Sequence, residues 1–330
     1  MTIKDSVQRA LERAMGASIS GEDLAKSLSV SRNAVWKAVK ELQDEGFIID
    51  AASHRGYCLT GRPDLISAEC IARHLPAAHP FRISVCNTIT STNTVLKSMA
   101  EKGAPEGTVL IAEEQTAGKG RMNRSFYSPA GTGIYISVLL RPRFSAAESL
   151  SITTAAAVAV AEAVEQESGR ETKIKWVNDV YCSGKKLCGI LTEAAFDMET
   201  RGLAYAVLGI GINVQPPCSG FPQELEPIVT SVWTREEYQG DRRNRLAADV
   251  LTRFWRFYER LTEKPFLASY QQRSLLNDTD VVVLSGETAR AARALEIDDD
   301  CRLHVRYDDG TEEYLCSGEV SVKPCVRKEP

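Results

Sequence analysis

The chain has 330 residues, of which 43% are hydrophobic and 25% charged, and its formal net charge is −4. This composition is typical of a soluble globular protein of two or three domains. The negative balance argues against a protein that coats nucleic acid, although it allows one small DNA-reading module. The N-terminus is polar and no apolar run reaches membrane-spanning length, so we expect a cytoplasmic protein with no membrane partner.

The nine cysteines are scattered along the chain without any C-x-x-C pair, and the four histidines show no metal-ligand spacing. A disulfide framework or a zinc site would need closer, paired spacing. We therefore expect reduced cysteines and no metal cage built by the protein alone.

Residues 1–62 predict a winged helix-turn-helix. Ser20 begins a capping box before an amphipathic helix, and Ser31 can cap a second helix that buries Val35, Val39 and Leu42. Two short strands at 47–49 and 56–59 follow, around a polar tip. Helix, turn, helix and hairpin is the order of a winged DNA-binding module.

The exposed face of the second helix carries side chains that can contact phosphates and base edges. These candidate DNA-binding residues are Ser31, Arg32, Asn33, Trp36, Lys37 and Lys40. The alternative is an ordinary solvated helix face. Because the module itself is nearly neutral, DNA affinity should require a dimer that reads two half-sites.

After a linker at 61–63, residues 63–275 predict a larger domain. Strands are expected at 83–86, 109–113, 134–140, 173–177, 187–192 and 204–212, and helices at 92–101, 149–167 and 245–261. Their irregular order favours an α+β fold with a mixed sheet over a doubly wound fold. Residues 276–330 predict a small β-barrel or sandwich, with strands at 281–284, 294–297, 303–307 and 314–315.

The segment Gln115–Arg124 follows an apolar strand and combines small residues with the cations Lys119, Arg121 and Arg124. Small residues let backbone N–H groups approach a ligand, and cations bind carboxylate or phosphate. The segment therefore predicts an anion clamp, with a solvated basic loop as the alternative. It lacks the Ser/Thr and upstream glycine of a P-loop.

A second charged motif, Lys175-Trp-Val-Asn-Asp179, ends in oxygen ligands suited to nucleotide-bound Mg²⁺. Lys186 lies seven residues further on and is expected to return beside Asp179 as a hairpin partner. The alternative is an ordinary strand end. The segment at Ser91, Thr92 and Asn93 likewise has an alternative, because these residue types are the usual helix N-caps.

Together these motifs, with Gly209-x-Gly-x-Asn213 and the closing Ser317–Val322 segment, resemble the biotin protein ligases in their order along nearly the whole chain. The N-terminal module makes the chain similar to the bifunctional kind, which is both ligase and biotin operon repressor. The resemblance implies a class II synthetase-like central domain, a C-terminal SH3-like barrel, and the substrates biotin and ATP with Mg²⁺. It also implies a biotin carboxyl carrier protein and operator DNA as partners, and a homodimer when biotinyl-5′-AMP is bound as corepressor.

The resemblance also implies residue roles, with Lys186 and Arg121 as the catalytic pair and Asp179 holding Mg²⁺ through the nucleotide. The implied biotin-binding residues are Ser91, Thr92, Asn93, Gln115, Lys119, Gly120, Arg121, Lys186 and Gly189. The implied ATP-binding residues are Arg124, Asn178, Asp179 and Asn213.

Three positions depart from the family pattern, in which the loop usually reads G-R-G-R-x-G-R and the later motif K-W-P-N-D. Lys119 replaces an arginine and so loses bidentate geometry, Asn123 replaces a glycine but tolerates positive φ, and Val177 replaces a proline. Two other functions stay open: a non-enzymatic regulator that senses a carboxylate ligand, and a ligase for another acid such as lipoate.

Overall fold

The computed structural model describes residues 2–14, 17–44, 47–52, 56–61, 65–142, 149–196, 202–238, 240–285, 288–316 and 321–324. It divides into two compact units, Met1–Leu75 with Tyr238–Ala248 and Pro76–Glu237 with Asp249–Pro330. The three predicted domains at 1–62, 63–275 and 276–330 stay a prediction. No helix in the described ranges is both long and apolar enough to cross a membrane.

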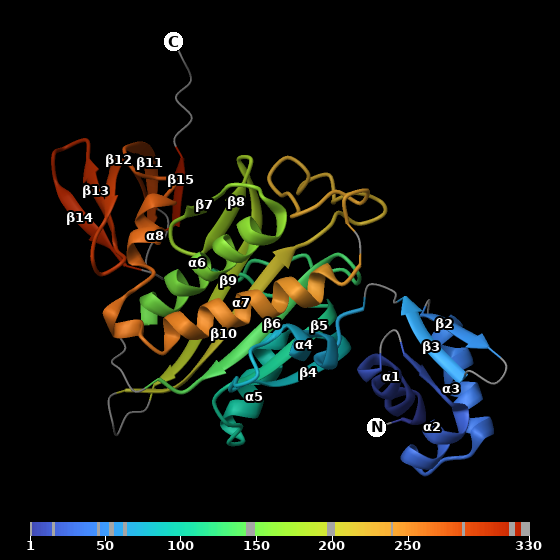
Figure 1. Ribbon diagram of the computed structural model, residues 1–330. Helices are drawn as coiled ribbons and strands as arrows, with labels where there is room; N and C mark the ends of the chain where they lie inside the picture. Colours follow the sequence, from blue (N-terminus) through green and yellow to red (C-terminus); the bar gives the residue numbers. More distant parts are fainter. Residues whose placement is uncertain are drawn as a thin grey trace. The chain divides into compact units, whose positions relative to one another are not determined.

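The first unit contains the predicted winged helix-turn-helix (Figure 1). Three helices, α1 (Ile3–Arg13), α2 (Gly21–Leu28) and α3 (Arg32–Asp44), accompany a sheet of β1 (Ser18–Ile19), β3 (Gly56–Gly61) and β2 (Ile48–Ala52) in that order. Helix α4 (Ala68–His74) completes the unit together with the first residues of α7. Helix α1, strand β1 and helix α4 were not predicted.

The helix caps explain where α2 and α3 begin. The Ser20 hydroxyl accepts from the backbone N–H of Asp23, and the Ser31 hydroxyl accepts from that of Ala34 at 3.1 Å. Ser29 takes the left-handed conformation, with φ 54°, in the turn between the helices. Val35, Val39 and Leu42 lie in the core with Leu11 and Leu24, as their spacing predicted.

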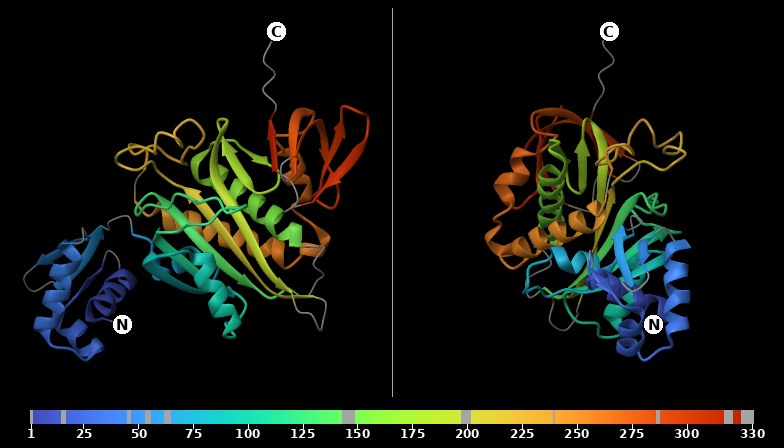
Figure 2. Two further views of the ribbon diagram at one scale, coloured as in Figure 1. Left: turned by 180° about the vertical axis from the view of Figure 1, so that it is seen from behind. Right: turned by 45° about the vertical axis from the view of Figure 1, so that its right-hand side comes forward.

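The second unit is built on a seven-stranded mixed sheet in the order β4-β5-β6-β10-β9-β8-β7 (Figures 1 and 2). Its strands are β4 (Arg82–Ile89), β5 (Thr108–Gln115), β6 (Gly133–Leu140), β7 (Thr172–Lys175), β8 (Asp179–Cys182), β9 (Lys185–Phe196) and β10 (Leu203–Asn213). Only β4 and β5 are parallel among these described pairings. The mixed α+β prediction is confirmed.

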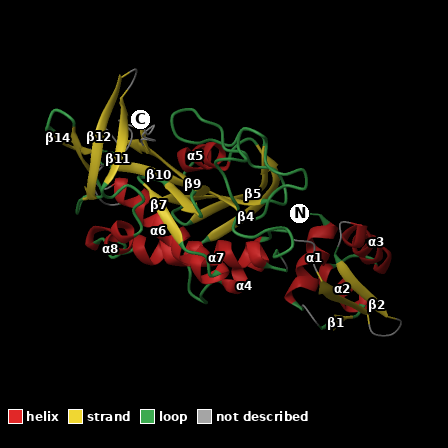
Figure 3. Ribbon diagram, turned by 90° about the horizontal axis from the view of Figure 1, so that it is seen from above, coloured by secondary structure: helices red, strands yellow, loops and turns green. Residues whose placement is uncertain are grey.

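Helices cover both faces of this sheet (Figure 3). On one face α5 (Thr92–Glu101) packs Leu96 and Ala100 against Leu139 and Val207 of the sheet. On the other face lies α6 (Ser149–Ser168), which is apolar all round and fully buried from Ala155 to Ala161. A helix that is apolar on every side must be covered on every side. Helix α7 (Arg242–Tyr258) contributes to that cover, with Arg253 paired to Glu162 of α6 at 3.3 Å.

The C-terminal part is a five-stranded antiparallel sheet in the order β14-β13-β12-β11-β15. Its strands are β11 (Thr279–Ser285), β12 (Thr288–Ile297), β13 (Leu303–Tyr307), β14 (Glu312–Leu315) and β15 (Ser321–Pro324). Residues 317–320 of the predicted closing segment lie outside the described residues. The turn η2 (Leu261–Glu263) and helix α8 (Leu267–Gln272), which precede this sheet, were not predicted.

Two predicted elements extended past their observed C-terminal ends. The strand predicted at 173–177 ends at Lys175, because residues 176–178 form a turn into β8, a strand that was not predicted. The last long helix begins at Arg242 and ends at Tyr258, and Leu261 belongs to a separate 3₁₀ turn. In the case of the strand, the apolar residues Trp176 and Val177 continue past the end of the regular element.

We expect Leu42→Ala to destabilise the first unit by about 2–4 kcal/mol, because Leu42 is fully buried in its core and truncation leaves a cavity. Hydrogen exchange of α3 in the full chain, followed by mass spectrometry along a urea series, measures this. Ile3→Ala is the matched control, since Ile3 is 44% exposed. Equal losses in the two variants would contradict the assigned core.

Candidate functional site

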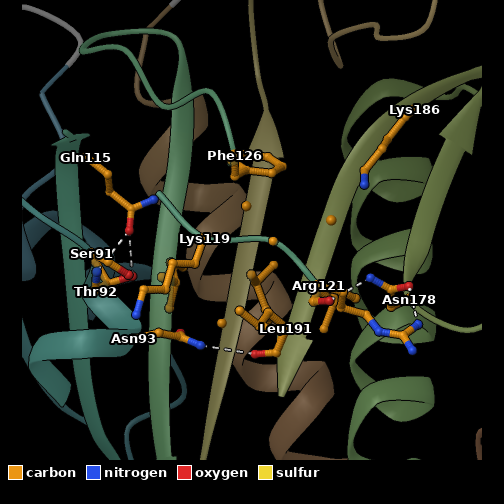
Figure 4. A pocket seen from close by; sticks show the side chains of 17 residues that line it. Ser91, Thr92, Asn93, Gln115, Lys119, Arg121, Phe126, Asn178, Lys186 and Leu191 are labelled. Atoms are coloured by element: carbon orange, nitrogen blue, oxygen red, sulfur yellow. Dashed lines mark hydrogen bonds between the residues drawn. The ribbon is translucent and has the colours of Figure 1, made fainter. Parts of the chain in front are cut away.

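One pocket in the second unit is lined by residues of α5, β5, β6, β9, β10 and the loop after β5 (Figure 4). All nine predicted biotin-binding residues line it: Ser91, Thr92, Asn93, Gln115, Lys119, Gly120, Arg121, Lys186 and Gly189. Asn178, one of the predicted ATP-binding residues, also lines it. Segments as far apart in the sequence as Ser91 and Gly211 thus supply one cavity.

The start of α5 supplies the polar end of the pocket. Ser91 is at the N-cap position, as the alternative interpretation held, yet its buried side chain makes no capping hydrogen bond. Thr92 donates its backbone N–H to Oε1 of Gln115 at 2.9 Å. Because a backbone N–H can only donate, this contact fixes the Gln115 amide oxygen toward Thr92.

The other end of the Gln115 amide faces the basic loop. Its Nε2 donates to the hydroxyl of Ser128 at 3.0 Å, and that hydroxyl donates to the carbonyl of Phe126 at 3.0 Å. An amide nitrogen carries two hydrogens, so one remains for a ligand in the pocket. Gln115 is therefore oriented before any ligand binds.

The basic loop is a tight turn in which Lys119 and the residues 122–125 are exposed. The backbone N–H of Gly120 donates to the carbonyl of Arg124 at 2.7 Å, and Lys119 forms a β-bridge with Ser125. Met122 and Asn123 take positive φ, 53° and 58°. Asn123 tolerates this conformation better than most residues, so its replacement of the family glycine is compatible with the turn.

Arg121 points across the pocket to the turn after β7 (Figure 4). Its Nη1 donates to Oδ1 of Asn178 at 3.1 Å, while Asn178 Nδ2 donates to the carbonyl of Ile190 at 2.8 Å. Burial lowers the pKa of Arg121, and the nearby Asp179 carboxylate opposes this effect. The guanidinium stays charged, because its ordinary pKa is above 12.

The predicted return of Lys186 beside Asp179 is confirmed. Strands β8 and β9 form a hairpin in which Asp179 is opposite Gly189, and Lys186 Nζ lies 2.7 Å from Asp179 Oδ1. The pair is partly exposed, with 30% and 22% of the two side chains accessible. This ammonium is the cation best placed for a ligand carboxylate at that end of the pocket.

Three predicted ATP-binding residues do not line the pocket. Arg124 is exposed on the loop, Asp179 is held by Lys186, and Asn213 donates its amide to the carbonyl of Thr230 at 3.1 Å. Their predicted roles stay predictions. The described residues contain no cluster of three or more His, Cys, Asp or Glu side chains suited to a metal.

The turn that carries Asn178 is fixed by α8 and by the segment between β12 and β13. The indole N–H of Trp176 donates to the carbonyl of Cys301 at 2.9 Å, and the buried hydroxyl of Tyr270 donates to the carbonyl of Val177 at 3.1 Å. The Trp176–Val177 peptide is cis. The segment is therefore a supported turn and not the ordinary strand end considered as the alternative.

The sequence interpretation missed the apolar wall of the pocket. Phe126, Ile136, Ile190 and Leu191 line it together with the backbone of Gly209, Ile210 and Gly211. A Cβ built at Gly211 would lie 2.6 Å from the Phe126 ring, so the ring lies directly on this strand. An aromatic residue two positions after the cationic run could have signalled such a wall.

On the first unit, the predicted DNA-binding residues form an exposed face of α3 and its cap. Ser31, Arg32, Asn33, Lys37 and Lys40 are exposed, and 53% of Trp36 is accessible, although large apolar side chains are usually covered. The face combines cations, an amide and an indole.

Three segments of the chain match models of known protein families. Residues 85–213 match the model of the biotin/lipoate A/B protein ligase family, residues 5–58 an HTH domain, and residues 281–323 the biotin protein ligase C-terminal domain. The bifunctional ligase/repressor BirA of Bacillus subtilis is 36% identical over 70% of this chain and 71% of its own length. The BirA of Escherichia coli is 31% identical over 77% and 76%.

The chain belongs to the bifunctional biotin ligase/repressor family. A solved structure of the Aquifex aeolicus biotin protein ligase in complex with biotin and ATP superimposes with a TM-score of 0.61 at 26% identity. It covers 74% of this chain and 99% of the Aquifex chain. The family resemblance predicted from the motifs is confirmed.

We expect Gly209→Ala to raise the KM for biotin at least tenfold. A Cβ there would run into the amide oxygen of Asn93, which is held by its own hydrogen bonds and cannot move without cost. Steady-state kinetics with biotin varied at saturating ATP measure this.

Ala204→Ser, which adds an atom at an exposed position of the same strand, is the control and should leave the KM unchanged. An unchanged KM in Gly209→Ala would show that the crowding at Asn93 does not shape the ligand site.

Proposed function

We propose that the chain activates biotin with ATP to biotinyl-5′-AMP and transfers the biotinyl group to a lysine of a biotin carboxyl carrier protein. The observation that carries this proposal is the pocket itself, with an amide and hydroxyls at one end and Lys186 and Arg121 at the other. Biotin has the same polarity, with a polar ureido ring at one end and a carboxylate at the other.

In the first step a biotin carboxylate oxygen attacks the α-phosphorus of ATP, and the bond to the bridging oxygen breaks to release pyrophosphate. In the second step the carrier lysine amine attacks the acyl carbon, AMP leaves, and the amine proton passes to solvent. Neither step requires an enzyme nucleophile. Catalysis then depends on positioning and on fixed positive charge where negative charge develops.

Within this scheme Lys186 exchanges Asp179 for the biotin carboxylate, and the displaced Asp179 becomes available beside Asn178. Carboxylate and amide oxygens are suitable ligands for Mg²⁺ that also binds nucleotide phosphates, and one carboxylate is sufficient for such a site. Mg²⁺ would supply neutralisation of phosphate charge there. Arg124, Asp179 and Asn213 remain the proposed ATP-side residues, with Asn178.

The regulatory part of the proposal concerns the exposed face of α3. The basic loop closes over biotinyl-5′-AMP, the liganded chain forms a homodimer, and the dimer presents two α3 helices to operator DNA. The family membership and the HTH domain support it. A ligase for lipoate within the same broad family is the second candidate function.

Lys186→Met tests the chemistry directly. We expect it to lower the rate of acyl-adenylate formation by about a hundredfold or more, because one charge contact to the developing transition state is lost. The assay incubates the chain with ATP, Mg²⁺ and either biotin or lipoate, and detects the adenylate by mass. Lys185→Met is the control, since Lys185 donates to the carbonyl of Glu226. Adenylation of lipoate but not biotin would overturn the proposed substrate.

DNA binding is tested with a palindromic operator selected from random DNA by the chain in the presence of biotin and ATP. We expect protection in footprinting only with both ligands. Lys37→Ala should weaken binding and reduce the salt slope by about one, as expected for a lost phosphate contact. Lys102→Ala, with the same change of charge at an exposed site of the second unit, should not. Protection without ligands would contradict the switch.

A further inference from the structure

A buried chain of polar side chains extends from the pocket to an ion pair that does not line it. Ser137 lies in the middle of β6 and is fully buried. Its hydroxyl oxygen lies 2.7 Å from that of Thr92 and 2.6 Å from Oδ1 of Asn93. Thr92 and Asn93 line the pocket, whereas Ser137 and the ion pair of Lys97 with Glu193 are absent from its lining.

The ion pair fixes the orientation of Asn93. Its Nδ2 lies 3.0 Å from Oε2 of Glu193 and 3.3 Å from the carbonyl of Leu191, and both of these oxygens can only accept. Glu193 is ionised: burial raises its pKa, but hydrogen bonds from Lys97 and Asn93 outweigh burial and lower it. The amide nitrogen must therefore face Glu193, which leaves Oδ1 facing Ser137 as an acceptor.

The hydrogens along the chain can then be assigned. Three oxygen–oxygen contacts exist, Ser137 to Asn93 at 2.6 Å, Thr92 to Ser137 at 2.7 Å, and Thr92 to Oε1 of Gln115 at 3.1 Å. Only two hydroxyl hydrogens are available for them, because the amide oxygens carry none. The two shortest contacts take them, since two oxygens at that distance without a hydrogen between them repel. Ser137 donates to Asn93, and Thr92 donates to Ser137.

We propose that Glu193, acting through Asn93 and Ser137, commits the Thr92 hydroxyl to donate into the protein and so presents its oxygen to the pocket as an acceptor. An acceptor there matches a ring N–H of the biotin ureido group, while the remaining hydrogen of the Gln115 amide offers a donor. Ser137 and Glu193 are thus positioning residues for substrate selection. This inference rests on the proposed function, because the ureido group is the ligand it explains.

The reversed chain shows why the carboxylate matters. If Asn93 turned its nitrogen toward Ser137, Ser137 would donate to Thr92. The Thr92 hydrogen would then no longer be held by Ser137, and it could point either to Oε1 of Gln115 at 3.1 Å or into the pocket as a donor. A neutral amide in place of Glu193 can face Asn93 with either its oxygen or its nitrogen, and it therefore permits both directions. Ionised Glu193 permits only one.

We expect Glu193→Gln and Ser137→Ala each to raise the Kd for biotin, measured by calorimetry, by about tenfold. The KM for ATP and the rate at saturating biotin should change less than twofold, because neither residue contacts the cationic end. Glu165→Gln is the matched control: Glu165 is also partly buried, 27% exposed against 24% for Glu193, and is also paired with a cation, Arg273. It should bind biotin like the wild type.

A double variant separates direction from simple packing. Asn93→Asp with Glu193→Gln exchanges the amide and the carboxylate, keeps the net charge, and again leaves only an acceptor facing Ser137. We expect the double variant to restore the biotin Kd to within about threefold of the wild type. Asn93→Asp alone places two carboxylates together, and its biotin Kd should be higher than that of Glu193→Gln or of the double variant.

Unchanged biotin affinity in Glu193→Gln, or a double variant no better than Glu193→Gln, would overturn the inference. Failure of the proposed function has a different signature, namely no biotin binding by the wild-type chain itself. Ser137→Ala remains informative if the carboxylate variants unfold, because it removes the relay without changing charge; normal biotin affinity in that folded variant would equally overturn the inference.

Discussion

The pocket depends on one constraint, which is that polar groups placed inside an apolar sheet must all be paired. Strand β6 is buried along its whole length, and Ser137 carries a hydroxyl in its interior. A buried hydroxyl without a partner costs roughly 1–3 kcal/mol in stability. Its contacts with Thr92 and Asn93 offset that cost and at the same time fix two pocket residues. The same hydrogen bonds therefore stabilise the sheet and set the geometry of the ligand site.

The cationic end follows a different rule. Lys186 and Arg121 are already partnered, Lys186 by Asp179 and Arg121 by the Asn178 amide. These partners are partly exposed and can be exchanged for a ligand anion at modest cost, because solvent screens the ion pair. The polar end of the pocket is thus oriented before the ligand binds, whereas the cations at the other end are paired with protein groups that a ligand anion can replace. This difference suits a two-step ligase. The polar end binds biotin in both steps, while the cationic end contacts phosphate groups whose charge changes between the steps.

The sequence predicted the features that depend on local patterns. The caps at Ser20 and Ser31 and the spacing of Val35 and Leu42 each involve residues close together in the sequence, and the structure has each of them. The pocket lining was predicted through the order of the motifs. The limits appear where contacts are distant. Glu193 lies 100 residues from Asn93 in the chain, and no spacing links them. The turn at Trp176 likewise depends on Cys301, 125 residues away.

The contact between Trp176 and Cys301 links the C-terminal sheet to the pocket. Trp176 and Val177 are held by Cys301 and Tyr270, and the backbone N–H of Ile174 donates to the carbonyl of Arg273 at 2.7 Å. The short strand β7 is at the edge of the seven-stranded sheet, and an edge strand of four residues has few partners of its own. The segments around α8 and before β13 supply the missing ones. Asn178 and Asp179 follow the turn that begins after this strand. The position of the proposed nucleotide side of the pocket is therefore set by residues more than ninety positions downstream.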